Sequence, residues 1–431
     1  MRLWPLSNDI KSKQFIKIFK RPDGEYESMI QRVYAGLRNL DCGADITIAT
    51  SKSQVSLIHN QLGCDVSVCV EPCRRDTFPA IVLATAYLHD VKGIAEDEVA
   101  VVCPVDPYVE SDYFAALEEL GVLASGDGAN LVLMGIEPTY PSEKYGYIIP
   151  TGMDSVSGAA AFKEKPDAAA AREYIRNGAL WNGGVFAYKL GYVLSKAHEM
   201  IDFDGYEDLY EKYGELEKIS FDYAVVEKES RILVMRFAGQ WKDLGTWNTL
   251  TEAMGECCVG PAMLDEECSN VHVVNELDVP IVCMGLKDAV VSASPQGILV
   301  SDKERSGYIK PYVEKTDRKV MFAEKSWGDY KVIDVGADSL TIKVTLKPGQ
   351  KMNYHSHSRR DEVWTVIHGE GRVVIDGNSR IVRAGDVVNM PAGCRHTIEA
   401  LTELDVIEVQ IGKDISVSDK IKSKEMPDEI K

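Results

Sequence analysis

Four residues in the C-terminal third of the chain combine the side chains and the spacing of a metal site. His355 and His357 are separated by one residue, and Glu362 and His396 follow further along the chain. On a strand, residues two apart point to the same face, so both imidazoles can meet a carboxylate and a third imidazole from neighbouring strands. Such nitrogen and oxygen ligands suit Zn²⁺, Fe²⁺, Mn²⁺ or Ni²⁺. We expect one transition metal here; the alternative is a module that binds none. His368 lies outside the spacing and is expected to be structural.

A second candidate site lies at the other end of the chain, where Arg2 and Lys13 stand eleven residues apart around an apolar turn. Two fixed cations on a loop can offset the negative charge that develops when a phosphoryl group is transferred. The alternative is an arginine and a lysine on a surface turn, with apolar stems packed on the protein and charged ends in water. Composition alone favours that alternative.

Composition bounds the class of protein and its partners. With 431 residues, 45% of them hydrophobic, the chain is long enough for two or three domains with their own cores. The net charge of −19 argues against nucleic acid as a partner, although a pocket can still attract a small anion. No apolar run is long enough to span a membrane and no signal peptide is found, so we expect no membrane partner and a cytoplasmic location. The ten cysteines form no CxxC pair, which fits reduced thiols.

The elements that would position the first cations alternate between helix and strand. Apolar residues recur at helical spacing, and short solidly apolar runs lie between the helical stretches. This alternation predicts a parallel sheet covered on both faces, with ligands at the carboxyl ends of its strands. Asp106 stands at such an end, although a lone Asp there is often a turn or cap residue. The expected helices are Glu27–Leu40, Phe78–His89 and Tyr113–Leu123, and the expected strands are Ile46–Ala49, Val66–Val70, Val99–Cys103 and Leu131–Met134.

The first fifteen residues, MRLWPLSNDIKSKQF, carry a longer signature. Arg2–Ser7 and Lys13–Phe15 resemble the opening signature of the sugar-1-phosphate nucleotidylyltransferases, and most closely that of the mannose-1-phosphate guanylyltransferases. In that family a strand and a glycine-rich loop precede the Arg and bind the nucleotide phosphates through backbone N–H groups. This chain begins at Met1, within the signature. We expect Met1 to be an internal methionine taken as the start; the alternative is that half of the nucleotide site has been lost.

The resemblance implies roles for further residues. Asp106 matches the Mg²⁺-binding Asp of the family's Pro-x-Asp-His motif, with Pro107 in place of the His, and Asp243 in WKDLGTW resembles the second Mg²⁺ ligand. With Arg2 and Lys13 they form the implied catalytic set. The segments EPCRRDTFPAI, KYGYI, FKEKPD, WNGGVF and FDYAVVEK imply the nucleotide- and sugar-binding residues Glu71, Arg75, Asp76, Tyr145, Gly146, Glu164, Lys165, Asn182, Gly183 and Asp222. The family has Asn at the position of Asp76, which leaves the choice of guanine open.

The C-terminal histidines belong to two further motifs. The spacings G-x5-H-x-H-x4-E-x6-G from Gly349 and G-x5-P-x-G-x2-H from Gly385 resemble the pair of cupin motifs, and the module resembles the type II phosphomannose isomerase domain. It departs from that family in lacking the Arg and Pro of the opening segment and in having Val363 where the family has His. Arg359 or Arg360 could take the place of the family's active-site Arg.

Together these resemblances imply a Rossmann-like α/β nucleotidyltransferase domain with a mixed, mostly parallel sheet (1–257), a small β-helical linker (258–314) and an all-β cupin barrel (315–431). The expected reaction joins mannose 1-phosphate, or another sugar 1-phosphate, to GTP, or another nucleoside triphosphate, for polysaccharide biosynthesis, with Mg²⁺ as cofactor. Two alternatives remain: metal-dependent mannose-6-phosphate isomerisation in the cupin, and an inactive sensor or assembly subunit. A homo-oligomer is compatible with the expected reaction and with both alternatives.

Overall fold

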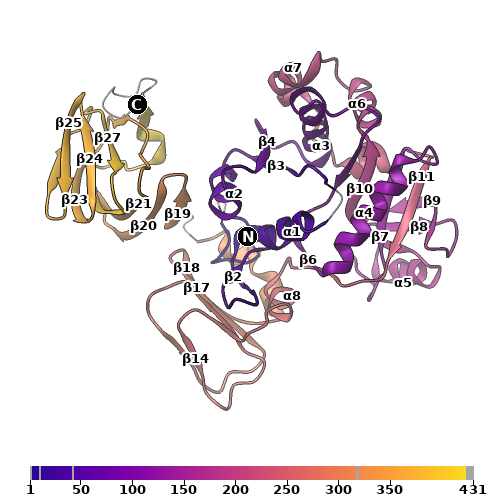
Figure 1. Cartoon of the computed structure of the whole chain (residues 1–431). Coiled ribbons are helices and arrows are strands. Elements are labelled where there is room, and N and C mark those ends of the chain that lie inside the picture. Colours follow the sequence, from indigo (N-terminus) through magenta and orange to yellow (C-terminus); the bar gives the residue numbers. More distant parts are fainter. Residues whose placement is uncertain (1, 9–10, 41–42, 317–319, 424–431) are drawn as a thin grey trace. The chain divides into compact units, whose positions relative to one another are not determined.

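The computed structural model describes residues 2–8, 11–40, 43–316 and 320–423 (Figure 1). Met1, where the expected signature is interrupted, lies outside the described residues. The chain forms two compact units. The α/β unit contains residues 13–255, and the β unit contains residues 1–12 and 256–431.

Residues 1–12 group differently from the sequence-based division, which placed them with the N-terminal domain. They belong to the β unit. The physical reason is a set of contacts with the linker: the Ser294 hydroxyl donates to the Pro5 carbonyl at 2.9 Å, and the Lys11 ammonium lies 2.9 Å from the Glu276 carboxylate.

The α/β unit is built around a six-stranded sheet with the order β5-β10-β7-β11-β9-β8. The α/β class is confirmed, but the sheet is less parallel than expected. Within it only β7 and β11 pair in parallel, because β8 and β9 form a hairpin and β10 enters antiparallel between β5 and β7. The strands are β5 (Val99–Val102), β7 (Leu131–Ile136), β8 (Tyr147–Pro150), β9 (Val156–Lys163), β10 (Leu180–Lys189) and β11 (Ile232–Phe237).

Helices and short strand pairs complete this unit. A separate parallel pair is formed by β3 (Thr47–Ser51) and β4 (Ser67–Glu71), and an antiparallel pair by β1 (Phe19–Lys20) and β2 (Tyr26–Glu27). The α-helices are α1 (Met29–Arg38), α2 (Val55–Leu62), α3 (Thr77–Ala86), α4 (Ser111–Ser125), α5 (Ala168–Arg176), α6 (Leu190–His198), α7 (Gly205–Lys212) and α8 (Trp247–Glu252). Among the described residues, no helix is long and apolar enough to cross a membrane.

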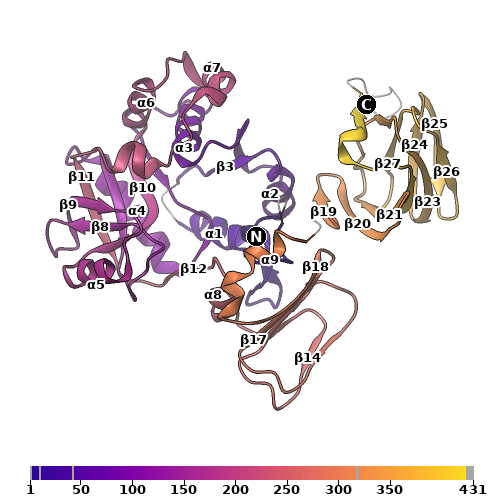
Figure 2. The ribbon, with the colours of Figure 1, turned by 180° about the vertical axis from the view of Figure 1, so that it is seen from behind.

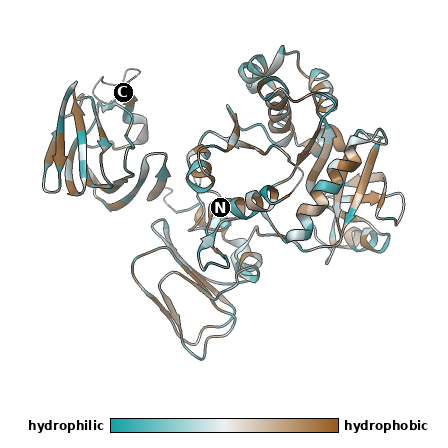
Figure 3. Cartoon of the chain, in the orientation of Figure 1, coloured by the Kyte–Doolittle hydropathy of each residue, from teal (hydrophilic) through white to brown (hydrophobic). Residues whose placement is uncertain are grey.

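The centre of the six-stranded sheet, at β7, is buried on both faces, as the sequence predicts. Leu131 and Leu133 of β7 pack with α3, α6 and α7, whereas Val132 and Met134 pack with α4 and α5 on the other face. This is the two-residue alternation of a strand, and it explains why β7 is apolar at every position. Figure 3 shows hydrophobic residues along the strands of this sheet.

The linker part of the β unit is a coil of short parallel strands. β13, β15 and β17 pair in parallel, β14 pairs in parallel with β16, and β18 closes the first ladder antiparallel to β17. Small and branched apolar side chains such as Val273, Ala289 and Val291 fill its core. The expected β-helical linker is confirmed. Its strands are β13 (Cys258–Val259), β14 (Ala262–Leu264), β15 (His272–Asn275), β16 (Ile281–Cys283), β17 (Ala289–Ser294) and β18 (Gly297–Asp302).

The C-terminal part is the expected cupin barrel, made of two antiparallel sheets. Figure 2 shows strands of both sheets facing each other, with β20 and β21 in one and β24 and β27 in the other. Trp364, Val366, Val373 and Ile398 meet in the core between the sheets. The first sheet contains β19 (Phe322–Lys325), β20 (Gly328–Val335), β21 (Ser339–Leu346), β28 (Leu404–Ile411), β23 (Asp361–His368) and β26 (Val387–Met390). The second contains β25 (Asn378–Arg383), β24 (Glu370–Ile375), β27 (His396–Ala400), β22 (His355–His357) and β29 (Lys420–Lys422).

Candidate active site and metal centre

A short strand pair brings together two aspartates that are far apart in the sequence. β6 (Pro107–Val109) pairs antiparallel with β12 (Trp241–Asp243), with Asp243 opposite Pro107. Asp106 directly precedes β6, so its carboxylate lies beside that of Asp243. The Lys13 ammonium is 2.9 Å from one oxygen of Asp106 and 3.0 Å from one oxygen of Asp243. Three of the four residues expected to act in catalysis therefore converge on one point.

The cluster consists of two carboxylates paired with one ammonium group. Burial alone would lower the pKa of the Lys13 ammonium, but Asp106 and Asp243 raise it above 10.5, so the ammonium stays charged at neutral pH. The two carboxylates, 43% and 36% exposed, remain accessible to a ligand. Two carboxylates that face a shared cation are the oxygen ligands that Mg²⁺ prefers. The residues present therefore fit the expected magnesium ion.

Arg2, the fourth expected residue, belongs to the β unit, where it is exposed in a turn at the start of the chain. Its part in the site stays a prediction.

Aromatic rings border the aspartate cluster. The Tyr145 ring centroid lies 5.0 Å from that of Trp181 and 5.5 Å from that of Trp241. Burial raises the pKa of Tyr145, and the nearby hydroxyl of Tyr140 raises it further, as do the charges of both aspartates. The indole N–H groups of Trp181 and Trp241 are buried and have no hydrogen-bond partner within the described protein.

Glu164 and Asp222 are two of the residues expected to bind the sugar phosphate, and both have hydrogen-bond or ion-pair partners. Gly146 lies so close to Glu164 that an added Cβ would be 2.8 Å from Glu164 Oε2. The Asn182 amide donates to Asp222 at 2.7 Å, which fixes the orientation of the amide. Burial raises the pKa of Asp222, although the bond from Asn182 opposes this. Lys165 pairs with Glu164.

The remaining expected ligand residues have structural partners. Asp76 caps α3, since its carboxylate accepts the Thr77 N–H at 2.8 Å, and its φ of 75° is unusual for a residue with a side chain. The Tyr213 hydroxyl donates to Glu71 at 3.1 Å. Arg75 donates to the Gly214 carbonyl, and an added Cβ on Gly183 would lie 3.0 Å from Ile136. Their contacts with a nucleotide stay predictions.

The four residues expected to bind a transition metal lie together in the cupin barrel. The histidines come from β22 and β27 and the glutamate from β23; all four are buried, with ligand atoms within 4.8 Å of one another. The Nδ1 atoms of His355 and His396 lie 2.6 and 3.1 Å from the carbonyls of Asn353 and Cys394. A carbonyl only accepts, so each Nδ1 carries the proton and each Nε2 presents a lone pair.

Glu362 completes a set of buried lone pairs that a bound cation would stabilise. Its Oε2 lies 3.2 Å from His396 Nε2, and neither atom has a hydrogen-bond partner within the described protein. Two buried lone pairs facing each other repel unless a positive ion lies between them. The residues present therefore fit a bound metal ion.

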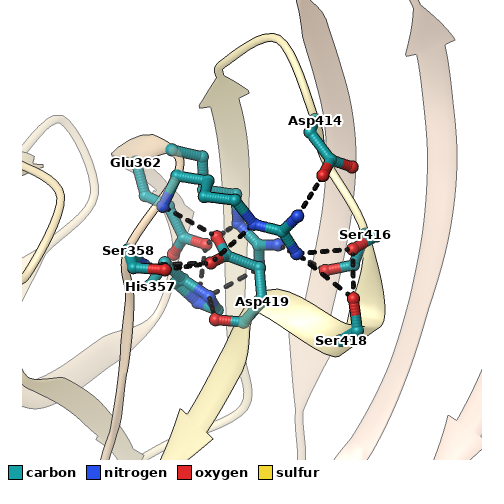
Figure 4. Close-up of polar contacts among 9 residues, drawn as sticks. His357, Ser358, Glu362, Asp414, Ser416, Ser418 and Asp419 are labelled. Atoms are coloured by element: carbon teal, nitrogen blue, oxygen red, sulfur yellow. Dashed lines mark hydrogen bonds and ion pairs between the residues drawn. The ribbon is translucent and has the colours of Figure 1, made fainter.

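The sequence left open whether Arg359 or Arg360 lies near the metal ligands, and the structure distinguishes the two. Arg360 is the buried one: its guanidinium donates to Glu362 at 3.0 Å and to His357 Nε2 at 3.1 Å. The Arg359 guanidinium instead pairs with Asp414 and Asp419, two residues labelled in Figure 4. Arg360 is therefore the arginine next to the metal ligands.

Sequence reasoning missed three polar residues near the metal ligands. Glu408 and Gln410 are buried on β28, where Gln410 lies opposite Glu362. Burial raises the pKa of Glu408 to about 8, and the negative charge of Glu362 contributes. Polar residues at inward positions of an alternating strand were a readable signal for both. Asp419, which precedes the short strand β29, gave no such signal.

Comparison with known proteins identifies the class. The family model described as nucleotidyl transferase matches residues 1–258, and the model described as mannose-6-phosphate isomerase C-terminal matches residues 314–425. The chain belongs to the nucleotidyl transferase family, as the signature predicted, and is an enzyme of that class with an isomerase-like cupin domain.

Relatives of nearly full length share both parts. The chain is 28% identical to a putative mannose-1-phosphate guanylyltransferase of Vibrio cholerae, covering 98% of this chain and 96% of that protein. It is 28% identical to the mannose-1-phosphate guanylyltransferase of Escherichia coli, covering 98% and 95%. It is 27% identical to the alginate biosynthesis protein AlgA of Pseudomonas aeruginosa, covering 97% and 93%.

A solved structure shares the fold of the larger part of the chain. It is titled as a mannose-1-phosphate geranyltransferase from Thermus thermophilus, with a TM-score of 0.62 and 28% identity. The match covers 73% of this chain and 95% of that one.

Proposed function

We propose that the protein transfers a guanylyl group from GTP to mannose 1-phosphate, giving GDP-mannose and pyrophosphate for polysaccharide biosynthesis. The observation that carries the proposal is the convergence of Lys13, Asp106 and Asp243 in a member of the nucleotidyl transferase family. The choice of substrates is supported by the near-full-length relatives named mannose-1-phosphate guanylyltransferase.

The cluster has the charges that nucleotidyl transfer needs. An oxygen of the sugar phosphate attacks the α-phosphorus, and pyrophosphate leaves from the opposite side. The ammonium of Lys13 offsets negative charge that develops on the phosphoryl oxygens. Asp106 and Asp243 would hold Mg²⁺, which supplies charge neutralisation for the phosphates when bound. This direct attack needs no side chain as a nucleophile.

The sugar would be held by groups whose positions are already fixed. Glu164 can accept hydrogen bonds from sugar hydroxyls, and the Asn182 amide, held by Asp222, keeps its orientation without a ligand. Gly146 brings the backbone close because it has no Cβ. Groups that are oriented in advance lose little entropy on binding.

An assay of substrate pairs tests the proposal. Four nucleoside triphosphates would each be combined with mannose 1-phosphate and glucose 1-phosphate in the presence of Mg²⁺, and kcat/KM would be measured from pyrophosphate release. We expect GTP with mannose 1-phosphate to be the best pair. A faster pair would reassign the substrates, and no product from any pair would favour the alternative of an inactive sensor.

We also propose that the cupin binds about one transition metal ion per chain, through His355, His357, Glu362 and His396. Isomerisation of mannose 6-phosphate is expected to be weak, because Val363 and the opening segment depart from the isomerase pattern. Metal analysis of protein purified without chelators and a coupled isomerase assay test these two statements. Absence of metal would reduce the cupin to a structural module. Robust, chelator-sensitive isomerisation would make the enzyme bifunctional.

A further inference from the structure

The last described segment of the chain returns to the strand that carries two of the metal ligands. β29 pairs antiparallel with β22, and His357 lies opposite Lys420. The residues before β29 contact Arg359 and Arg360 through Asp414, Ser416 and Ser418, which Figure 4 labels together with Asp419.

Asp419 contacts the end of β22 through both its backbone and its side chain. Its carbonyl lies 3.3 Å from Nδ1 of His357. Its carboxylate accepts hydrogen bonds from the Ser358 N–H at 3.0 Å, the Ser358 hydroxyl at 2.8 Å and the Arg359 N–H at 3.2 Å. The side chain of Asp419 is buried, so these bonds are shielded from water.

His357 differs from the other two histidines in what orients it. The Nδ1 atoms of His355 and His396 bond to carbonyls two residues earlier in the chain, at Asn353 and Cys394. Those contacts are local and form whenever the strand forms. The partner of His357 is 62 residues away, in the C-terminal segment. The tautomer and the ring orientation of His357 therefore depend on where that segment is held.

The same segment also holds Arg360. The Ser416 carbonyl accepts a bond from the Arg360 guanidinium at 3.0 Å, and the opposite side of this guanidinium donates to Glu362 at 3.0 Å. A second metal ligand is thus linked to the C-terminal segment through one intermediate side chain.

We infer that Asp419 is a positioning residue of the cupin metal site. Its carboxylate binds the two backbone N–H groups that follow His357, and this contact keeps the Asp419 carbonyl against Nδ1 of His357. Nε2 of His357 then presents its lone pair beside Glu362, 3.0 Å away, where the Arg360 guanidinium donates to it. Partners of this kind, which orient a ligand without touching the metal, typically change metal affinity by about 10–100-fold. The inference rests on the proposed metal site.

Titration of the full-length protein with Co²⁺ tests this role, with competition by a chelator to obtain the affinity and visible absorption to report the ligand geometry. We expect Asp419→Ala to weaken Co²⁺ binding by about 10–100-fold and to change the absorption bands. Asp419→Asn, which keeps one acceptor oxygen for Ser358, is expected to have a smaller effect. Asp414→Asn is the matched control, because Asp414 lies in the same segment and its carboxylate pairs with the Arg359 side chain. It should bind Co²⁺ as the unmodified protein does.

Three outcomes would overturn the inference. A folded Asp419→Ala protein with lower Tm but unchanged affinity and spectrum would make Asp419 merely structural. If that variant does not fold, Ser358→Ala removes one donor to the carboxylate, and unchanged affinity in this variant would count equally against the role. Failure of the unmodified protein to bind Co²⁺ would refute the metal site itself, and the positioning role with it.

Discussion

Replacement of Asp243 by asparagine separates catalysis from stability in the α/β unit. The change keeps the shape of the side chain and removes one of the two carboxylates that face Lys13. Asp106 remains within 2.9 Å of the Lys13 ammonium, so the lysine keeps a partner. The expected magnesium ion, in contrast, is left with one carboxylate.

The two consequences differ in size. The Asp243 side chain is 36% exposed, so its pair with Lys13 is screened by water and contributes about 0–1 kcal/mol to the free energy of unfolding. Removal of one preorganised electrostatic group from an active site typically lowers kcat by about 10²–10³-fold, or about 2.7–4 kcal/mol of transition-state stabilisation. We therefore expect Asp243→Asn to lose at least two orders of magnitude in turnover with little change in Tm.

Pyrophosphate release at saturating GTP, mannose 1-phosphate and Mg²⁺ gives the turnover, and thermal unfolding gives the stability. Asp127→Asn is the control, because Asp127 is 99% exposed and pairs with Lys189 on the surface of the same unit. Near-normal turnover in Asp243→Asn would remove this residue from the site. A large fall in Tm would show that the loss of turnover came from unfolding.

Further predictions concern the sugar side, the linker and the cupin. Gly146→Ala should raise KM for the sugar phosphate and destabilise the unit by about 1–3 kcal/mol, because the added Cβ would lie 2.6 Å from the Phe162 ring and the ring must shift; unchanged KM and Tm would refute the close approach. Burial, and then the charge of Lys303, lower the pKa of His272 from 6.5 in the unfolded chain to about 4 in the folded protein. Between these two pH values the unfolded chain binds more protons than the folded protein, so the free energy of unfolding should rise with pH from about 4 to 6.5. His272→Gln should reduce that slope in a series of thermal melts, and an identical slope would count against it. Replacing His355 and His357 together with Ala should strip the cupin metal and leave nucleotidyl transfer largely intact, which metal analysis and the pyrophosphate assay would check; loss of transfer would mean that the two activities are coupled.

Local sequence patterns predicted the elements of the α/β unit but not the directions of its strands. The run Leu131–Met134 lies within β7, and the helical spacing in Tyr113–Leu123 lies within α4. Strand direction is set by long-range pairing: β10 follows α5 and inserts antiparallel between β5 and β7. An alternation of helices and strands along the chain carries no information about that insertion.

The site residues show the same division between local and long-range information. Spacing alone predicted the cupin ligands, because His355 and His357 lie on one strand and Glu362 soon follows. The contact between Asp106 and Asp243 depends on pairing of β6 with β12, which no local pattern reveals, so only the family resemblance joined them. Asp419 was missed because its partners are mainly backbone N–H groups, which look alike in every sequence.

Isotope transfer from mannose 1-phosphate tests the proposed reaction most directly. The sugar phosphate would carry ¹⁸O on its non-bridging oxygens and would be incubated with the full-length protein, GTP and Mg²⁺, and mass spectrometry would follow the label. Attack by the sugar phosphate on the α-phosphorus predicts GDP-mannose that contains the ¹⁸O and pyrophosphate that contains none. Label in the pyrophosphate, or consumption of GTP without labelled GDP-mannose, would contradict nucleotidyl transfer at the Lys13, Asp106 and Asp243 cluster.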